Sequence, residues 1–168
     1  GRLPITFYKS ANDLPDYTSY AMKGRTYRYY EGDVAFPFGF GLSYTTYSYS
    51  APKLSSGTFK KDETLTVTVD VTNTGEIDGE EIVQMYIRDK VSSATRPVKE
   101  LKGYQRVALK AGETKTVSFD IDAESLAFYD INMAYCVEPG EFTIMTGSSS
   151  NDEDLKLTTL EVTNRIEL

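Results

Sequence analysis

The stretch "TLTVTVDVT", residues 64–72, decides the fold class of this 168-residue chain. Apolar residues occupy every second position, and the residues between them are threonines and an aspartate. Strict alternation of this kind is typical of a β-strand with one face buried and the other in water. The segment that follows, "NTGEIDG" (residues 73–79), is rich in turn-forming residues and ends the strand.

Similar short runs fill the rest of the chain. They cover residues 80–89, 100–109, 114–121, 126–130, 134–138, 141–147 and 155–163. Turn signals such as "KAGE" separate them, and no helical period intervenes. This pattern predicts an all-β protein, an immunoglobulin- or fibronectin type III-like antiparallel β-sandwich. One segment, "DAESL" (residues 122–126), is expected to form either a helical turn capped by Asp122 or a loop.

The alternation also predicts which side chains point between the two sheets. These core residues are Val67, Val69, Val71, Met85, Val117, Phe119, Ile121 and Phe142. In "LKGYQRV", Leu101 and Val107 are further core candidates. Gly103 lies in mid-strand, where a glycine indicates a bulge or a close approach of another group.

Composition narrows the function. The net charge is −7 and the isoelectric point is near 4.7. Nucleic acids and anionic membranes require a basic surface, so both are disfavoured as partners. No apolar run is long enough to span a bilayer. Histidine is absent, which removes the commonest general base, and the single Cys136 is expected to be a buried, inert thiol.

The first part of the chain has a different character. Thirteen of the 21 aromatic residues fall within the first 50 positions, although the chain has no tryptophan. We therefore expect two parts: an N-terminal extended, aromatic-rich arm over residues 1–45, and the sandwich over residues 46–168. Such an arm lacks the regular period that a core of its own would require, so it must lie on a surface built by other residues.

Three interpretations of the aromatic stretch are open. Its rings fill a seam with another domain, form a platform for sugars, or contribute to the rim of an active site with Arg28 as a hydrogen-bond donor. Large aromatic side chains suit a permanent interface, which favours the packing interpretation. The residues assigned to this interdomain packing are Tyr27, Arg28, Tyr29, Tyr30, Phe36, Pro37, Phe38, Phe40, Leu42 and Tyr44.

Several motifs in order resemble one known family. The stretch "YRYYEG…AFPFGFGLSYT" (residues 27–45) resembles the segment after the catalytic domains of family 3 glycoside hydrolases, the β-glucosidases and β-xylosidases. "GRLPITF" (1–7) resembles the last strand of their α/β sandwich domain. The segments 71–89, 96–121 and 137–150 resemble their C-terminal fibronectin type III-like domain.

This resemblance implies that the chain is the C-terminal part of an enzyme and lacks the catalytic residues. In the family, the catalytic aspartate and the acid/base glutamate both lie upstream of the region that this chain matches. The resemblance therefore implies no catalytic residue, no cofactor and no metal in this chain. It implies the upstream catalytic domains as partners, a β-linked saccharide as the substrate of the parent protein, and a secreted or periplasmic location, although "GRLPITFYKS" shows no signal peptide.

The acidic residues raise the alternative that this chain has a catalytic or calcium-binding site of its own. Glycosidases use two carboxyl groups about 5–10 Å apart. With 25 acids in the chain, chance pairs are expected, and a solvated face is predicted for Glu80, Glu81, Asp89, Asp120 and Asp122. The stretch "NDED" (151–154) offers oxygen ligands for calcium but lacks the spacing of an EF-hand loop, so a solvated loop is predicted there.

Three classes of function follow from the sequence. The first is a non-catalytic structural domain that stabilises the upstream domains. The second is a carbohydrate-binding module that presents the aromatic stretch to a polysaccharide. The third, an autonomous enzyme, is disfavoured because histidine and recognisable catalytic motifs are absent. If the rings are left without their partner domain, self-association of the isolated chain is expected.

Overall fold

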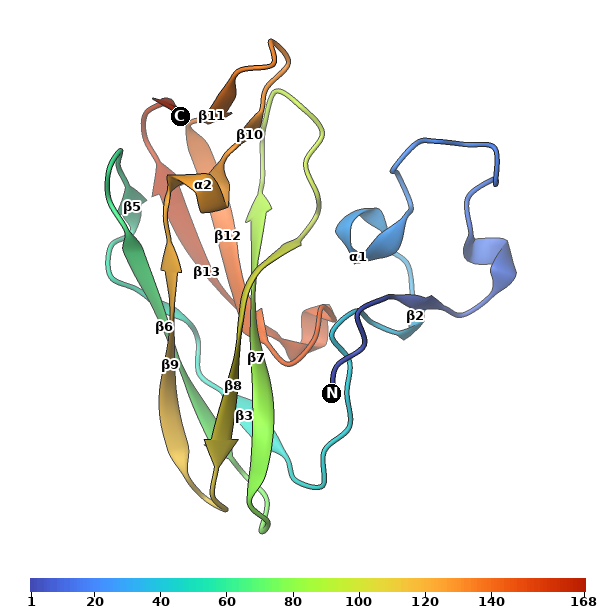
Figure 1. Cartoon of the computed structure of the whole chain (residues 1–168), viewed down its shortest axis with the longest axis vertical. Helices are drawn as coiled ribbons and strands as arrows, with labels where there is room; N and C mark the ends of the chain where they lie inside the picture. The colour runs from blue at the N-terminus through green and yellow to red at the C-terminus, as the bar shows by residue number, and fades with distance from the viewer.

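The computed structural model describes residues 1–168 and shows two parts (Figure 1). An elongated β-sandwich contains most of the chain. The N-terminal arm forms a smaller lobe that projects from one side of this sandwich.

One sheet of the sandwich has five strands in the order β5-β13-β12-β7-β8. Its long members run antiparallel, and the short β5 adds the only parallel pairing, against β13. The strands are β5 (Thr58–Phe59), β7 (Gly79–Asp89), β8 (Glu100–Leu109), β12 (Gly140–Gly147) and β13 (Leu155–Val162).

The second sheet is built around β6. This strand pairs with three others, all antiparallel, and its longest pairing, with β9, extends from Leu65↔Ile121 to Thr72↔Thr114. The strands are β3 (Tyr47–Tyr49), β4 (Lys53–Leu54), β6 (Leu65–Asn73) and β9 (Thr114–Ile121).

The long strands confirm the sequence analysis. The runs predicted over residues 64–72, 80–89, 100–109 and 114–121 correspond to β6, β7, β8 and β9 within one residue at each end. The segment 1–7, which resembles a strand of the α/β sandwich domain, contributes only its last residue to a strand, because β1 covers Phe7–Tyr8. The short strands β3, β4 and β5 were not predicted, since two or three residues are too few to display a period.

The predicted core is confirmed. All eight residues lie in one buried cluster of 20 side chains between the two sheets, and Val67, Val71 and Phe142 have no exposed surface. Leu101 and Val107 are only partly buried. Val107 packs on this cluster, whereas Leu101 packs on a second, smaller cluster on the other face of the sheet.

Gly103 shows both features that its position predicted. The pairing of β7 with β8 shifts between Met85↔Gly103 and Tyr86↔Leu101, which leaves Lys102 as an extra residue. A Cβ at Gly103 would lie 2.9 Å from Cδ1 of Phe119. Because that distance is below ordinary contact, only glycine lets β8 approach the Phe119 ring.

A third, small sheet closes one end of the sandwich. It consists of β10 (Phe128–Tyr129), β11 (Tyr135–Val137) and β14 (Ile166–Glu167) in the order β10-β11-β14. The segment before it forms the helical turn α2 (Ala123–Leu126), and the Asp122 carboxylate accepts a hydrogen bond from the Ser125 amide at 2.8 Å. The expected cap is therefore present.

The arm contains little regular structure. Its elements are β1 (Phe7–Tyr8), the 3-10 turn η1 (Ala11–Asp13), the helical turn α1 (Thr26–Tyr29) and β2 (Val34–Phe36), which pairs with β1. A second 3-10 turn, η2 (Asp152–Asp154), lies in the sandwich where the arm docks (Figure 1). None of the helices has the length and apolar character required to cross a membrane.

Candidate functional site

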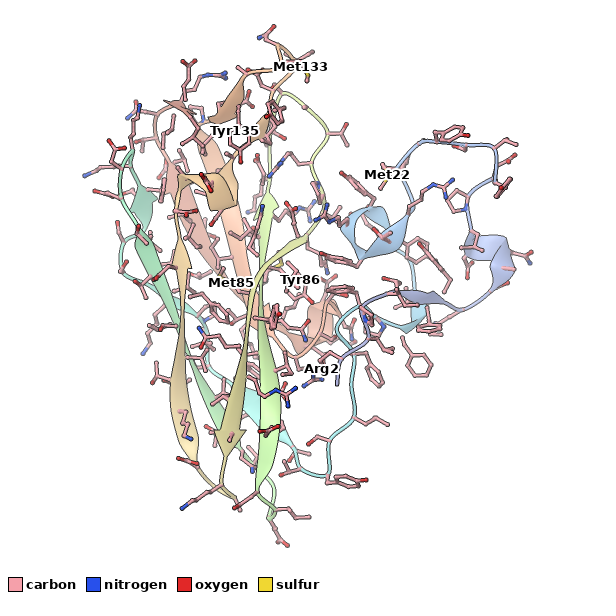
Figure 2. All side chains as sticks on the ribbon, viewed as in Figure 1. Arg2, Met22, Met85, Tyr86, Met133 and Tyr135 are labelled. Atoms are coloured by element: carbon pink, nitrogen blue, oxygen red, sulfur yellow. The ribbon has the colours of Figure 1, made fainter.

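The arm docks on the sandwich through stacked rings. Tyr27 and Phe38 stack with centroids 4.1 Å apart and planes 16° from parallel. Tyr27 also meets the ring of Tyr86 edge to face, with centroids 6.0 Å apart. Tyr86, on the outer face of β7, has no exposed surface and lies where the arm crosses the sheet (Figure 2). These contacts attach the arm to the outer face of β7.

Gln84 fixes the arm by hydrogen bonds. Its amide nitrogen donates to the carbonyl of Gly39 at 3.1 Å and to the carbonyl of Ser148, and its amide oxygen accepts from the Tyr86 hydroxyl at 2.6 Å. Gly39 has φ +80°, and a Cβ there would collide with the Gln84 amide oxygen. Both the backbone conformation and the space therefore require glycine at this contact.

Backbone groups complete the inner contact. The Ser150 amide donates to the Phe38 carbonyl at 2.9 Å, and the Val98 amide donates to the Arg28 carbonyl at 2.7 Å. The Arg28 guanidinium pairs with the Glu100 carboxylate at 2.8 Å. Arg28 thus helps to hold the arm on β8, although its side chain remains 43% exposed.

The outer face of the arm is apolar and open. Phe36 lies between Phe7 and Phe40, with centroids 6.1 Å and 5.2 Å away, and remains 46% exposed. A groove of about 620 Å³ runs along these rings and Leu42. Leu42 is 88% exposed, so this face has no partner within the chain.

The ten residues assigned to interdomain packing therefore divide between two faces. Tyr27, Arg28 and Phe38 contact the chain's own sandwich. Tyr30 packs edge to face on Tyr8 within the arm, with centroids 4.9 Å apart. Tyr29 and Pro37 are half-buried, and the residues on the open side are Phe36, Phe40, Leu42 and Tyr44.

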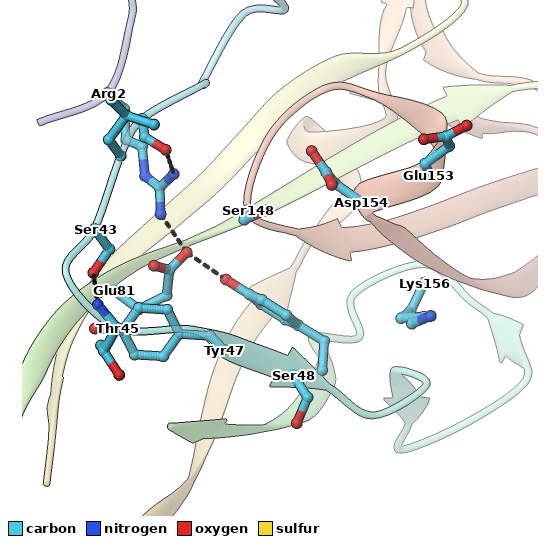
Figure 3. A pocket seen from close by; sticks show the side chains of 13 residues that line it. Arg2, Ser43, Thr45, Tyr47, Ser48, Glu81, Ser148, Glu153, Asp154 and Lys156 are labelled. Carbon is cyan, nitrogen blue, oxygen red and sulfur yellow. Dashed lines mark hydrogen bonds and ion pairs between the residues drawn. The ribbon is translucent and has the colours of Figure 1, made fainter. Parts of the chain in front are cut away.

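The N-terminus reaches the sandwich core through an ion pair that sequence analysis missed. The Arg2 guanidinium pairs with the carboxylate of Glu81, which also accepts a hydrogen bond from the Tyr49 hydroxyl at 2.7 Å (Figure 3). Glu81 is only 1% exposed. Burial raises the pKa of the Glu81 carboxyl, while the hydrogen bond from Tyr49 and the charge of Arg2 oppose the rise.

The prediction of a solvated acidic face is thus wrong for two of its five residues. Glu81 and Asp89 are buried, whereas Glu80, Asp120 and Asp122 are exposed. Asp89 lies 3.9 Å from Arg96, whose guanidinium covers the Phe128 ring. The alternation of β7 carries the missed signal, because Glu81 and Asp89 share the inward phase of Val83, Met85 and Ile87.

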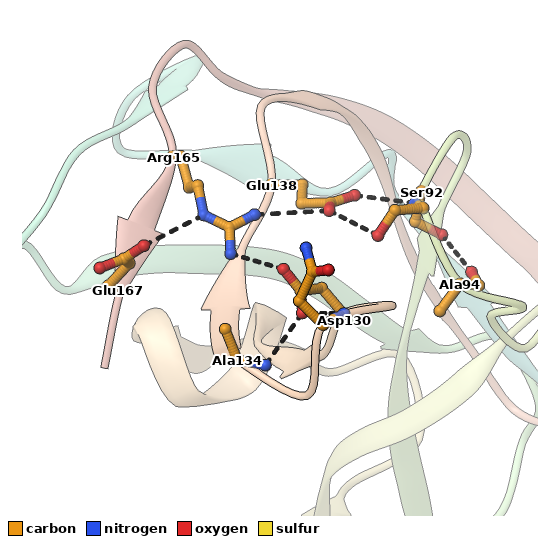
Figure 4. Close-up of polar contacts among 9 residues, drawn as sticks. Ser92, Ala94, Asp130, Ala134, Glu138, Arg165 and Glu167 are labelled. Atoms are coloured by element: carbon orange, nitrogen blue, oxygen red, sulfur yellow. Dashed lines mark hydrogen bonds and ion pairs between the residues drawn. The ribbon is translucent and has the colours of Figure 1, made fainter.

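Cys136 is buried, as predicted, but it has a cationic neighbour. Arg165 pairs with Asp130 at 2.6 Å and with Glu138 and Glu167 around this thiol (Figure 4). Burial nevertheless raises the pKa of the Cys136 thiol, against the opposing charge of Arg165. Three potential metal ligands, Asp130, Cys136 and Glu138, lie close together here, but Arg165 already pairs with both of the carboxylates.

The "NDED" segment is exposed at Asn151, Asp152 and Glu153. Asp152 pairs with Lys99, and Asp154 accepts a hydrogen bond from the Ser149 hydroxyl at 2.6 Å. Both carboxylates therefore hold the η2 turn in place beside the arm.

The sandwich belongs to a known class of domain. Residues 81–150 match the family model described as a fibronectin type III-like domain. That match covers the sandwich from β7 to the end of β12 and stops before η2, so that the arm and strands β3 to β6 precede it.

Similar proteins identify the family. The chain is 46% identical over 162 residues to a β-xylosidase of Formosa agariphila and 44% identical over 162 residues to a periplasmic β-glucosidase of Salmonella typhimurium. These matches cover 96% and 89% of this chain but only 22% and 21% of the two relatives. A solved β-glucosidase from Erythrobacter marinus superposes with a TM-score of 0.82 at 38% identity, over 97% of this chain and 22% of that one.

The chain belongs to the family 3 glycoside hydrolases and corresponds to their C-terminal fibronectin type III-like region with the linker that precedes it. It spans about a fifth of the length of the curated relatives that it matches.

Proposed function

We propose that this chain is the non-catalytic structural domain of a family 3 β-glycosidase and that it packs against the catalytic domains of the same polypeptide. The observation that carries the proposal is the apolar, solvent-exposed outer face of the arm. Phe36, Phe40 and Leu42 line an apolar groove on the side away from the sandwich. Contiguous apolar side chains that face solvent are typical of contact sites.

The catalytic activity of the parent is part of the same proposal. Its substrate class is β-glucosides or β-xylosides, in line with the names of the relatives. One of those relatives is periplasmic, which supports a periplasmic or secreted location for the parent. The contribution of the present chain is to stabilise the catalytic domains by covering their apolar surface.

The geometry disfavours the aromatic stretch as a sugar platform. A platform requires exposed rings that lie in nearly one plane. The exposed rings of Phe7 and Phe36 are 87° apart, and those of Phe36 and Phe40 are 41° apart. The one parallel pair, Tyr27 and Phe38, is enclosed against Tyr86.

The first test is activity. The purified chain, incubated with aryl β-glucosides and aryl β-xylosides, should release no more phenol than buffer does. Hydrolysis that disappears when one of the chain's own carboxylates is replaced would show that the chain is itself an enzyme.

The second test is stability in the longer protein. Joined to its upstream catalytic region, the Leu42→Ser and Phe36→Ser variants should lose activity on heating at lower temperatures than the unmodified protein. Ile131→Ser is the matched control, because Ile131 is 76% exposed in the β10–β11 connection, away from the arm. Equal heat resistance in all four proteins would refute the interdomain role.

A further inference from the structure

A polar cleft separates the end of the arm from the turn around η2. It measures about 470 Å³ and is lined by residues 41–49 on one side and by residues 148–156 on the other (Figure 3). Its volume falls in the range of small-molecule sites. Such sites are predominantly apolar, whereas ten of the 13 residues lining this cleft are not hydrophobic.

The cleft contains a buried acceptor with unused capacity. Both hydrogen bonds to the Glu81 carboxylate, from Arg2 and Tyr49, converge on Oε1. Oε2 therefore has no donor from the chain, although Glu81 is 99% buried. Oε2 keeps some contact with solvent at the cleft, where it can accept a hydrogen bond from a ligand.

Two more groups in the lining are unengaged. Asp154 accepts from Ser149 through Oδ2, which leaves Oδ1 without a donor. The Lys156 ammonium forms no ion pair with any carboxylate of the chain, and its side chain is exposed. The charge of Asp154 also contributes to the raised pKa of Glu81, which places the two carboxylates within electrostatic reach of each other.

This set of groups selects a kind of ligand. Two free carboxylate oxygens accept hydrogen bonds, and one ammonium donates up to three. A hydroxyl group both donates and accepts, so neighbouring hydroxyls satisfy both kinds of partner at once. An anion would meet the carboxylates of Glu81, Glu153 and Asp154, and a cation would meet Arg2 and Lys156.

We propose that this cleft binds a neutral, hydroxyl-rich ligand of mono- to disaccharide size, with Glu81 and Asp154 as acceptors and Lys156 as the donor. The cleft adjoins the aromatic face of the arm, with which it shares Arg2, Gly41 and Leu42, but its proposed hydrogen-bonding groups lie outside that face. It is formed by this chain alone and does not depend on the proposed contact with catalytic domains.

The experiment is a titration of the ¹⁵N-labelled 168-residue chain followed by amide NMR shifts. The probes are xylobiose, cellobiose and glycerol, each added separately, with calcium chloride as a fourth. We expect saturable shifts at Glu81, Ser148 and Asp154 with one or both disaccharides, with a Kd of about 1–10 mM. Shifts with glycerol alone would assign a small polyol instead of a sugar, which still supports a hydroxyl-binding cleft.

Variants separate binding from folding. Lys156→Ala removes the exposed donor and should weaken binding about tenfold, as expected for a charge-assisted hydrogen bond, without altering the rest of the spectrum. Asp154→Asn should also weaken binding. Lys61→Ala is the control, because Lys61 is exposed in a turn and has no side-chain partner. This variant should bind the ligand as tightly as the unmodified chain does.

Three results would overturn the proposal. The first is the absence of saturation with any sugar or polyol up to about 100 mM. The second is a response to calcium alone, which would make the cleft a cation site. The third is a sugar response confined to Phe36 and Phe40, which would restore the aromatic platform.

Discussion

The sandwich and the arm are held together by different means. In the sandwich, aliphatic and aromatic side chains at alternate positions form one continuous cluster between two sheets. The arm has no such cluster and depends on a few specific contacts, among them the Tyr27–Phe38 stack, the bond from Gln84 to Gly39 and the Arg2–Glu81 pair. A core distributes its stabilisation over many residues, whereas the docking of the arm concentrates it in a few. Substitutions in the two regions should therefore differ in how much stability they remove and in how far through the molecule their effects extend.

The largest effect is expected in the core. Phe119→Ala removes a ring that packs between the sheets and against Gly103, and it should lower the free energy of unfolding by about 3–5 kcal/mol. Urea denaturation followed by circular dichroism measures this loss. A decrease below about 1 kcal/mol would show that Phe119 is not part of the cooperative core.

A smaller, local effect is expected where the arm docks. Gly39→Ala adds a Cβ that collides with Gln84 at a positive φ, and should weaken docking by about 1–3 kcal/mol. Hydrogen exchange should quicken at arm amides such as Tyr30, while exchange in β6 and β9 is unchanged.

Gly112→Ala provides the matched control for Gly39. Gly112 has φ +74°, but no atom lies within 4 Å of an added Cβ. This variant should carry the backbone cost alone, in the turn between β8 and β9, and leave the arm protected. Equal loss of arm protection in both variants would refute the role of the Gly39–Gln84 contact.

The pH dependence should distinguish two buried carboxylates of opposite behaviour. The pKa of Glu81 is raised by burial, so its contribution favours folding at low pH and is lost as pH rises above 4.5. The pKa of Asp130 is lowered, chiefly by the hydrogen bond from Arg165, so its contribution is present above 3.8 and is lost as pH falls through the lower folded-state pKa.

Two neutral variants measure these contributions. Glu81→Gln should flatten the decline of stability above pH 4.5, and Asp130→Asn should flatten the decline in acid. Urea midpoints collected between about pH 3 and about pH 8 provide the comparison. If both variants flatten the same limb of the profile, the assignment of opposite shifts is wrong.

The smallest effect on stability is expected on the outer face of the arm. Leu42→Ser alters a side chain with almost no contacts and should change the free energy of unfolding by less than about 0.5 kcal/mol. The same change should weaken self-association of the isolated chain, measured by sedimentation at high concentration, whereas Ile131→Ser should not. A large loss of stability on Leu42→Ser would mean that this face packs within the chain.

Sequence patterns reveal the sandwich because its information is local. The alternation in β6 and β9 appears within eight or nine consecutive residues, and it assigned their inward faces correctly. The inward phase of β7 likewise includes Glu81. Glu81 was nevertheless predicted to be solvated, because a glutamate is rarely buried unless it is paired, and its partner Arg2 is 79 residues away in the sequence.

The docking of the arm could not be predicted in the same way. Gln84 and Gly39 are 45 residues apart, and neither residue type indicates the other. The one available signal is the run "IVQMYI" in β7, residues 82–87, which is nearly continuous in burial. A strand buried on both faces requires a cover on each side. The core provides one cover, and the arm provides the other.

The contact between Gly39 and Gln84 also sets an order of events during synthesis. The arm leaves the ribosome before the sandwich, yet its docking surface includes Tyr86 and Leu101, which follow Tyr27 by 59 and 74 residues, and Ser150, which follows Phe38 by 112 residues. Contacts that span such long segments form late, since the intervening chain must first be ordered. We therefore expect the rings of Tyr27 and Phe38, which face the sandwich, to remain without their partner and open to chaperones and to neighbouring chains until the sandwich has assembled.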